Sequence, residues 1–83
     1  MKIIKISALW CPGCLVINNS INKIKKEFNI EVIEYDYDFD DVEKYNVGNV
    51  LPVLIFVKDG EEVYRLIGER SYKDIREVVE KWR

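Results

Sequence analysis

The sequence has few of the residues that build metal sites and no long apolar segment. It contains no histidine and only two cysteines, Cys11 and Cys14. One such pair cannot complete a four-ligand zinc site, so carboxylates or a second subunit would have to supply the other ligands. The net charge of −2 gives no electrostatic basis for binding nucleic acid or an anionic membrane. No stretch approaches the ~18 apolar residues of a membrane span.

The residues that are present predict one small globular domain over residues 1–83. Hydrophobic residues make up 48% of the chain and charged residues 34%, a balance that argues against disorder. There are no internal repeats, low-complexity tracts or linkers that would divide the chain. A domain of this length buries roughly 60–65% of its unfolded surface, so we expect a free energy of unfolding of only several kcal/mol.

The first seven residues suggest a strand and a cytoplasmic location. They begin with a lysine, as a signal peptide does, but Lys5 interrupts the apolar run and no small-residue cleavage site follows. We therefore expect the chain to stay in a reducing cytosol. In that compartment a close cysteine pair is more often catalytic or metal-binding than structural.

Hydrophobic periodicity predicts the element order βαβαββα. Strands are expected at about 2–7, 30–36, 53–57 and 62–67, and helices at about 12–28, 39–46 and from Ser71 onward. The long helix carries an apolar stripe with a period of 3.6 residues, made of Cys14, Ile17, Ile21, Ile24 and Phe28. A right-handed crossover would pair the first two strands in parallel, and the Asp59-Gly60 turn would join the last two as a hairpin. The result is an α/β fold with a mixed four-stranded sheet flanked by helices.

The cysteine pair in Trp10-Cys11-Pro12-Gly13-Cys14 lies where the long helix begins. Pro12 fits the first helical position, and the unpaired N–H groups and helix dipole then favour the thiolate of Cys11. Cys14 lies on the buried stripe and should be less ionised. We therefore predict that Cys11 attacks a substrate disulfide and that Cys14 resolves the mixed disulfide. A permanent disulfide across so short a loop would add roughly 2 kcal/mol at best, which favours a redox role.

Two metal interpretations remain beside this one. The same cysteine pair could form half of a zinc or iron–sulfur site at a dimer interface. The acidic residues Asp36, Asp38, Asp40 and Asp41 faintly suggest a calcium loop, but the glycine and distal glutamate of an EF-hand are missing. We interpret these four carboxylates as turn and helix-start residues.

The cysteine motif and a later proline together resemble the thioredoxin/glutaredoxin superfamily. The resemblance covers essentially the whole chain and rests on residues 10–14, Lys44-Tyr45, Val50-Leu51-Pro52, the strand at 53–57 and Ile67-Gly68. It implies a thioredoxin-like fold and a monomeric thiol–disulfide oxidoreductase without a cofactor. It also implies protein disulfides as substrates, and a thioredoxin reductase-like enzyme or a small thiol as electron donor.

The resemblance also assigns supporting site residues. Pro52 would be cis and would pack beside the cysteines, and the backbone of Leu51 would bind an extended substrate segment. Trp10 would cover the rim of the site, or simply pack locally, while Pro12 and Gly13 would shape the turn between the two thiols.

Two positions depart from the family pattern. Thioredoxins carry a buried carboxylate six positions before the first cysteine, where this chain has Lys5. Either Lys5 extends to the surface, or the proton route differs and the ammonium helps to hold a thiolate. The short length and the Cys-Pro-Gly-Cys order are closer to glutaredoxin, but Gly68 stands alone where the glutathione site of glutaredoxins has two glycines. The electron donor is therefore left open.

Overall fold

The computed structural model covers residues 1–83 and contains four strands, two α-helices and one 3-10 turn. The elements are β1 (Lys2–Ser7), α1 (Pro12–Phe28), β2 (Glu31–Asp36), η1 (Glu43–Tyr45), β3 (Val53–Lys58), β4 (Glu61–Ile67) and α2 (Tyr72–Trp82). The predicted strands and both long helices are confirmed to within a residue or two. None of the helices combines the length and the apolar character needed to cross a membrane.

The four strands form one mixed sheet in the order β2-β1-β3-β4. β1 pairs in parallel with β2 and antiparallel with β3, and β3 and β4 form an antiparallel hairpin. β1 therefore lies inside the sheet with neighbours on both sides, and five of its six residues are buried. The cysteine motif therefore follows the end of an inner strand of the sheet.

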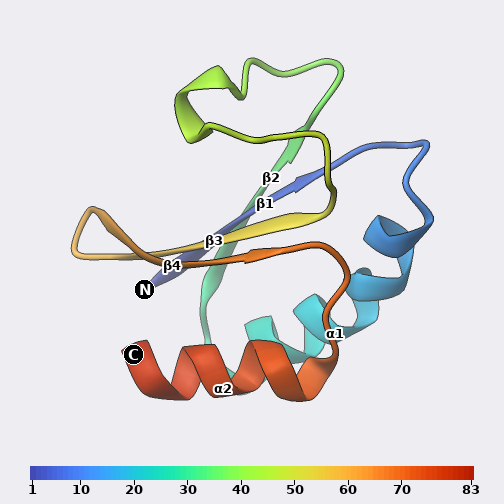
Figure 1. Ribbon diagram of the computed structural model, residues 1–83. Helices are drawn as coiled ribbons and strands as arrows, with labels where there is room; N and C mark the ends of the chain where they lie inside the picture. The colour runs from blue at the N-terminus through green and yellow to red at the C-terminus, as the bar shows by residue number, and fades with distance from the viewer.

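Both long helices cover the same face of the sheet (Figure 1). Their apolar stripes pack on that face against residues such as Ile3, Leu54 and Phe56, all completely buried. The opposite face carries a smaller core around Ile4 and Ile55, which is covered by side chains of residues 37–51. Figure 1 shows this segment, with η1, crossing the sheet on the side away from the helices. The two faces are thus covered by different kinds of structure.

The short helix expected at 39–46 is confirmed only over Glu43–Tyr45, as a 3-10 helix, and its expected length is wrong. The structure has only the three-residue turn η1, because aspartate side chains bind the backbone N–H groups in this region. Asp36 Oδ1 accepts hydrogen bonds from the N–H groups of Asp38 and Phe39, and Asp41 Oδ1 accepts one from Glu43. Such local side-chain acceptors compete with helix formation. Asp36, Asp40 and Asp41 are therefore turn carboxylates, as we interpreted them, whereas the Asp38 carboxylate binds the indole of Trp10.

The helix α1 begins and ends where its sequence predicts. Pro12 occupies its first turn, and Asn29 ends it in the left-handed conformation (φ 54°), donating its N–H to the carbonyl of Lys25. The four residues Cys14, Ile17, Ile21 and Ile24 are all buried. The buried stripe fixes the rotation of the helix, and so turns Cys14 toward the sheet.

Candidate active site

Cys11 directly precedes α1 and occupies its N-cap position. Its backbone is extended (φ −100°, ψ 106°), and no side chain caps the helix. The Cys11 N–H donates to the carbonyl of Ala8, and the Cys14 N–H donates to the carbonyl of Cys11, both at 3.2 Å. These bonds hold Cys11 at the N-cap position, as the motif predicts, and its side chain makes no hydrogen bond with the first N–H groups of the helix.

Both thiols are free and lie in a small apolar cluster with Ala8, against which Tyr37 and Leu51 pack. Cys11 is 6% exposed and Cys14 is 3% exposed. The deeper burial of Cys14 agrees with its place on the apolar stripe.

Cys14 holds its proton strongly. Its pKa is raised from 9.0 to about 11, mainly by burial and in addition by the hydrogen bond with Cys11. A backbone hydrogen bond involving Ala8 and the positive charge of Lys5 lower the pKa of Cys14 and partly offset these effects. At neutral pH Cys14 is therefore a neutral thiol, as expected of the group that reacts second.

Pro52 and Leu51 lie next to the cysteine motif. The Leu51–Pro52 peptide bond is cis, as the resemblance implies. A Cβ atom placed on Gly13 would meet Pro52 Cδ at 3.6 Å and Glu69 Oε1 at 3.2 Å, so the small residue lets the motif lie close to both. Pro52 also accepts a hydrogen bond from the Gly68 N–H at 2.8 Å, whereas neither the N–H nor the C=O of Leu51 is used within the chain.

Trp10 lies at the surface beside the motif with 59% of its area exposed. Its ring packs edge-on against Tyr37 with 6.4 Å between centroids, and its Nε1 donates to Asp38 Oδ2 at 2.7 Å. Trp10 is thus held against the 37–51 segment while most of its ring faces solvent, which suits a rim position.

Lys5 does not extend to the surface, so that interpretation of its role is wrong. Only 1% of the residue is exposed. Its Nζ donates to Asn18 Oδ1 and lies 3.5 Å from Glu34 Oε2. The interior of the protein therefore contains an ammonium group with polar partners. In the sequence of β1 this group lies between the apolar residues Ile4 and Ile6.

The cysteine pair is not part of a larger cluster of potential metal ligands. Nowhere in the chain do three or more cysteine, aspartate or glutamate side chains converge as the ligands of one ion would. Asp36 and Asp41 are occupied with backbone N–H groups, as described above. Any metal site would consequently have to draw half of its ligands from another molecule.

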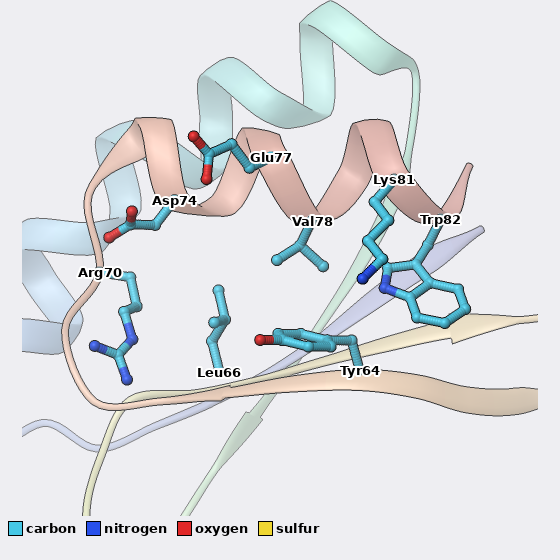
Figure 2. Close-up of a pocket in the computed structure, with 8 residues that line it drawn as sticks. All are labelled: Tyr64, Leu66, Arg70, Asp74, Glu77, Val78, Lys81 and Trp82. Carbon is cyan, nitrogen blue, oxygen red and sulfur yellow. The ribbon is translucent and has the colours of Figure 1, made fainter.

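A shallow groove of about 410 Å³ runs between β4 and α2, away from the cysteines. Figure 2 shows Tyr64 and Leu66 of β4 facing Val78 and Trp82 of α2 across it, with charged side chains along the helix. The buried indole Nε1 of Trp82 has no hydrogen-bond partner. None of the residues that line this groove belongs to the cysteine cluster, so the groove is separate from the candidate active site.

The sequence interpretation missed three polar residues around the site. Asp38 holds Trp10, while Asn18 and Glu34 hold Lys5. Two of them could have been found: Asn18 lies four residues after Cys14 on the same helix face, and parallel pairing of residues 2–7 with 31–36 puts Glu34 opposite Lys5. The bond from Trp10 to Asp38 depends on the turn at 36–41, and no pattern in the sequence indicates it.

Comparison with known proteins agrees with this fold and this motif. A sequence model of the thioredoxin family matches residues 1–81. The chain is 33% identical to a thioredoxin H-type protein of Fagopyrum esculentum over 73 residues, covering 83% of this chain and 61% of that protein. This chain thus spans about three fifths of the length of that relative.

Two solved structures show the same architecture. A thioredoxin of Fasciola hepatica superposes with a TM-score of 0.85 at 29% identity, covering 99% of this chain and 82% of that one. A mutant thioredoxin of Halobacterium salinarum has a TM-score of 0.89 at 21% identity, with 96% and 72% covered. With the family match extending over nearly every residue, the chain belongs to the thioredoxin family.

Proposed function

We propose that this protein is a thiol–disulfide oxidoreductase that reduces disulfides in other proteins. The observation that carries the proposal is the pairing of two unlike thiols at one helix start. Cys11 caps α1, and Cys14 lies one turn further on, more deeply buried and with a raised pKa. Membership of the thioredoxin family supports the same activity.

The reaction follows from the places of the two thiols. The Cys11 thiolate attacks one sulfur of the substrate disulfide, whose S–S bond breaks and releases one substrate thiolate. The mixed disulfide that forms at Cys11 is then attacked by Cys14, which gives up its proton. A Cys11–Cys14 disulfide forms, the second substrate thiol leaves, and two electrons have passed to the substrate.

We place the substrate segment against Leu51 and the motif. The unused backbone N–H and C=O of Leu51 can pair with an extended chain, in the manner of an added strand. Apolar side chains that are more than half exposed flank the motif and Pro52 in the sequence, namely Leu9, Trp10, Leu15 and Val50. Such a surface suits a protein substrate.

We further propose that the protein works as a monomer in the cytoplasm and is re-reduced by a thioredoxin reductase-like enzyme or a small thiol. Size-exclusion chromatography with light scattering tests the monomer. Parallel assays with thioredoxin reductase and with glutathione as electron donor identify which of the two sources regenerates the dithiol.

Trapping of the mixed disulfide tests the roles of the two cysteines. Cys14→Ser retains the attacking thiol and lacks the resolving thiol, so it should accumulate a covalent complex with a disulfide-containing protein through Cys11. Cys11→Ser is the matched control and should trap nothing. Mass spectrometry of thiol-blocked samples identifies the linked cysteine.

The opposite trapping pattern, with substrate held by Cys14, would reverse the assigned roles.

Elemental analysis of protein purified without chelator examines the metal alternative. Stoichiometric zinc or iron, together with absent disulfide reductase activity, would count against an oxidoreductase.

A further inference from the structure

The reaction described above leaves one buried charged group without a role. Lys5 lies in the interior of the sheet, 1% exposed, between Ile4 and Ile6 of its own strand. Burying an ammonium is costly unless it is paired, so its retention at this position calls for a specific function. Its partners are Asn18 on α1 and Glu34 on β2.

These partners fix the ammonium close to the resolving thiol. Asn18 lies four residues after Cys14, and residues at this spacing are neighbours on one face of a helix, about 5–6 Å apart at Cβ. Because Lys5 Nζ donates to Asn18 Oδ1, the positive charge lies beside the residue one helical turn after Cys14, and it lowers the pKa of the Cys14 thiol. Glu34 is anchored in turn by the Ser7 hydroxyl, which donates to Glu34 Oε1 at 3.2 Å.

We propose that Lys5 is a positioning residue for the resolving step, in which its ammonium, held by Asn18 and Glu34, stabilises the negative charge that develops on the Cys14 sulfur. The proposal rests on the oxidoreductase function above. A lysine that is already protonated cannot take the Cys14 proton, so it acts by charge and not as a base. The proton ends on the departing substrate thiol, and the Cys11–Cys14 bond replaces the mixed disulfide.

The groups around Lys5 determine whether each substitution should assist or hinder formation of the Cys14 thiolate. From α1 it faces Asn18, and its positive charge also acts on the Cys14 thiol; from β2 it faces the carboxylate of Glu34. From β3 its cross-strand partner is the apolar Leu54. Glu34 is the one negative charge paired with the ammonium, so it weakens the field of Lys5 at Cys14. Removing Lys5 should hinder formation of the Cys14 thiolate, and removing the charge of Glu34 should assist it.

The experiment uses a small aromatic disulfide whose released thiolate is coloured. The reduced protein releases one equivalent when Cys11 attacks and a second when Cys14 resolves, so the two steps are seen separately. Lys5→Met should slow the second release about threefold at a given pH, because the pKa of the Cys14 thiol rises and less of it is present as thiolate. Lys2→Met removes the same charge at the start of β1 and should leave both releases unchanged.

Glu34→Gln should change the rate of the second release in the opposite direction to Lys5→Met. We expect it to speed the second release about twofold to threefold, since the ammonium loses a partly screened counter-charge. The Glu34 side chain is 61% exposed, so this variant should fold even where Lys5→Met does not. NMR of ¹³C-labelled cysteine in a Cys11→Ser background adds a readout without turnover: the Cys14 titration midpoint should fall in Glu34→Gln.

Two results would overturn the role of Lys5. One is a second release in Lys5→Met as fast as in Lys2→Met, and the other is slowing by Glu34→Gln, which would indicate a purely structural pair. Failure of the oxidoreductase function gives a different pattern, because the first release would then already be slow in the unaltered protein.

Discussion

At the scale of single residues, the raised pKa of Cys14 links stability to pH. The folded protein keeps the Cys14 proton up to a pKa of about 11, whereas the ordinary value is 9.0. The folded state therefore binds more protons than the unfolded chain between these values. The stabilisation is fully present below about pH 9 and is lost as the pH rises toward 11.

The prediction is that reduced protein loses on the order of 1–2 kcal/mol more stability between pH 8 and pH 11 than Cys14→Ala does. Urea unfolding at the two pH values measures this difference. The alanine variant is the reference because lysines and tyrosines titrate in the same range in both proteins. Equal losses in both proteins would show that Cys14 is not desolvated as the structure has it.

The residue scale also shows where sequence interpretation succeeds. The stripe through Cys14 predicted its burial, because helical periodicity fixes which side of α1 meets the sheet. The burial of Lys5 could not be predicted in the same way. A lone lysine among isoleucines is equally compatible with a surface position, and only the pairing with Asn18 and Glu34 decides between the two.

At the scale of elements, α2 depends on a single capping side chain. Ser71 is its N-cap, and the Ser71 hydroxyl accepts a hydrogen bond from the Asp74 N–H at 3.2 Å. Ser71→Ala should therefore reduce the free energy of unfolding by about 1 kcal/mol. Ser20→Ala, inside α1, is the matched control and should be neutral or slightly stabilising, since alanine favours helix interiors.

Thermal and urea unfolding of both variants measure the contrast. Equal effects of the two substitutions would mean that the hydroxyl of Ser71 contributes nothing specific to the start of α2.

Elements differ in how far the sequence determines them. The strands and the two long helices have regular apolar periods, and their bounds followed from these periods. The segment at 36–47 does not have such a period. Asp36 and Asp41 bind nearby N–H groups, and this side-chain competition outweighed the helical character of residues 39–46.

At the scale of the whole molecule, stability rests on the core between the helices and the sheet. Ile75 is completely buried there, whereas Ile67 on β4 is half exposed. Ile75→Val should lower the free energy of unfolding by about 1 kcal/mol and Ile75→Ala by about 2–5 kcal/mol. A domain of 83 residues has a total of only about 4–12 kcal/mol, so the alanine variant should be near its limit.

Ile67→Val is the matched control and should change stability by less than about 0.5 kcal/mol. Urea unfolding at pH 7 compares the three variants. A loss in Ile67→Val as large as that in Ile75→Val would contradict the position of the core.

The outer edge of β2 affects whether two copies of the molecule can pair edge to edge. This strand pairs on one side only, so a row of backbone N–H and C=O groups remains available to another chain. Its sequence places Glu31, Glu34 and Asp36 along that edge, and a second copy aligned with it would bring three more carboxylates. Their mutual repulsion discourages edge-to-edge association at neutral pH. Glu34, whose carboxylate anchors Lys5 inside the fold, is therefore also one of the charges that we expect to oppose pairing of two copies at this edge.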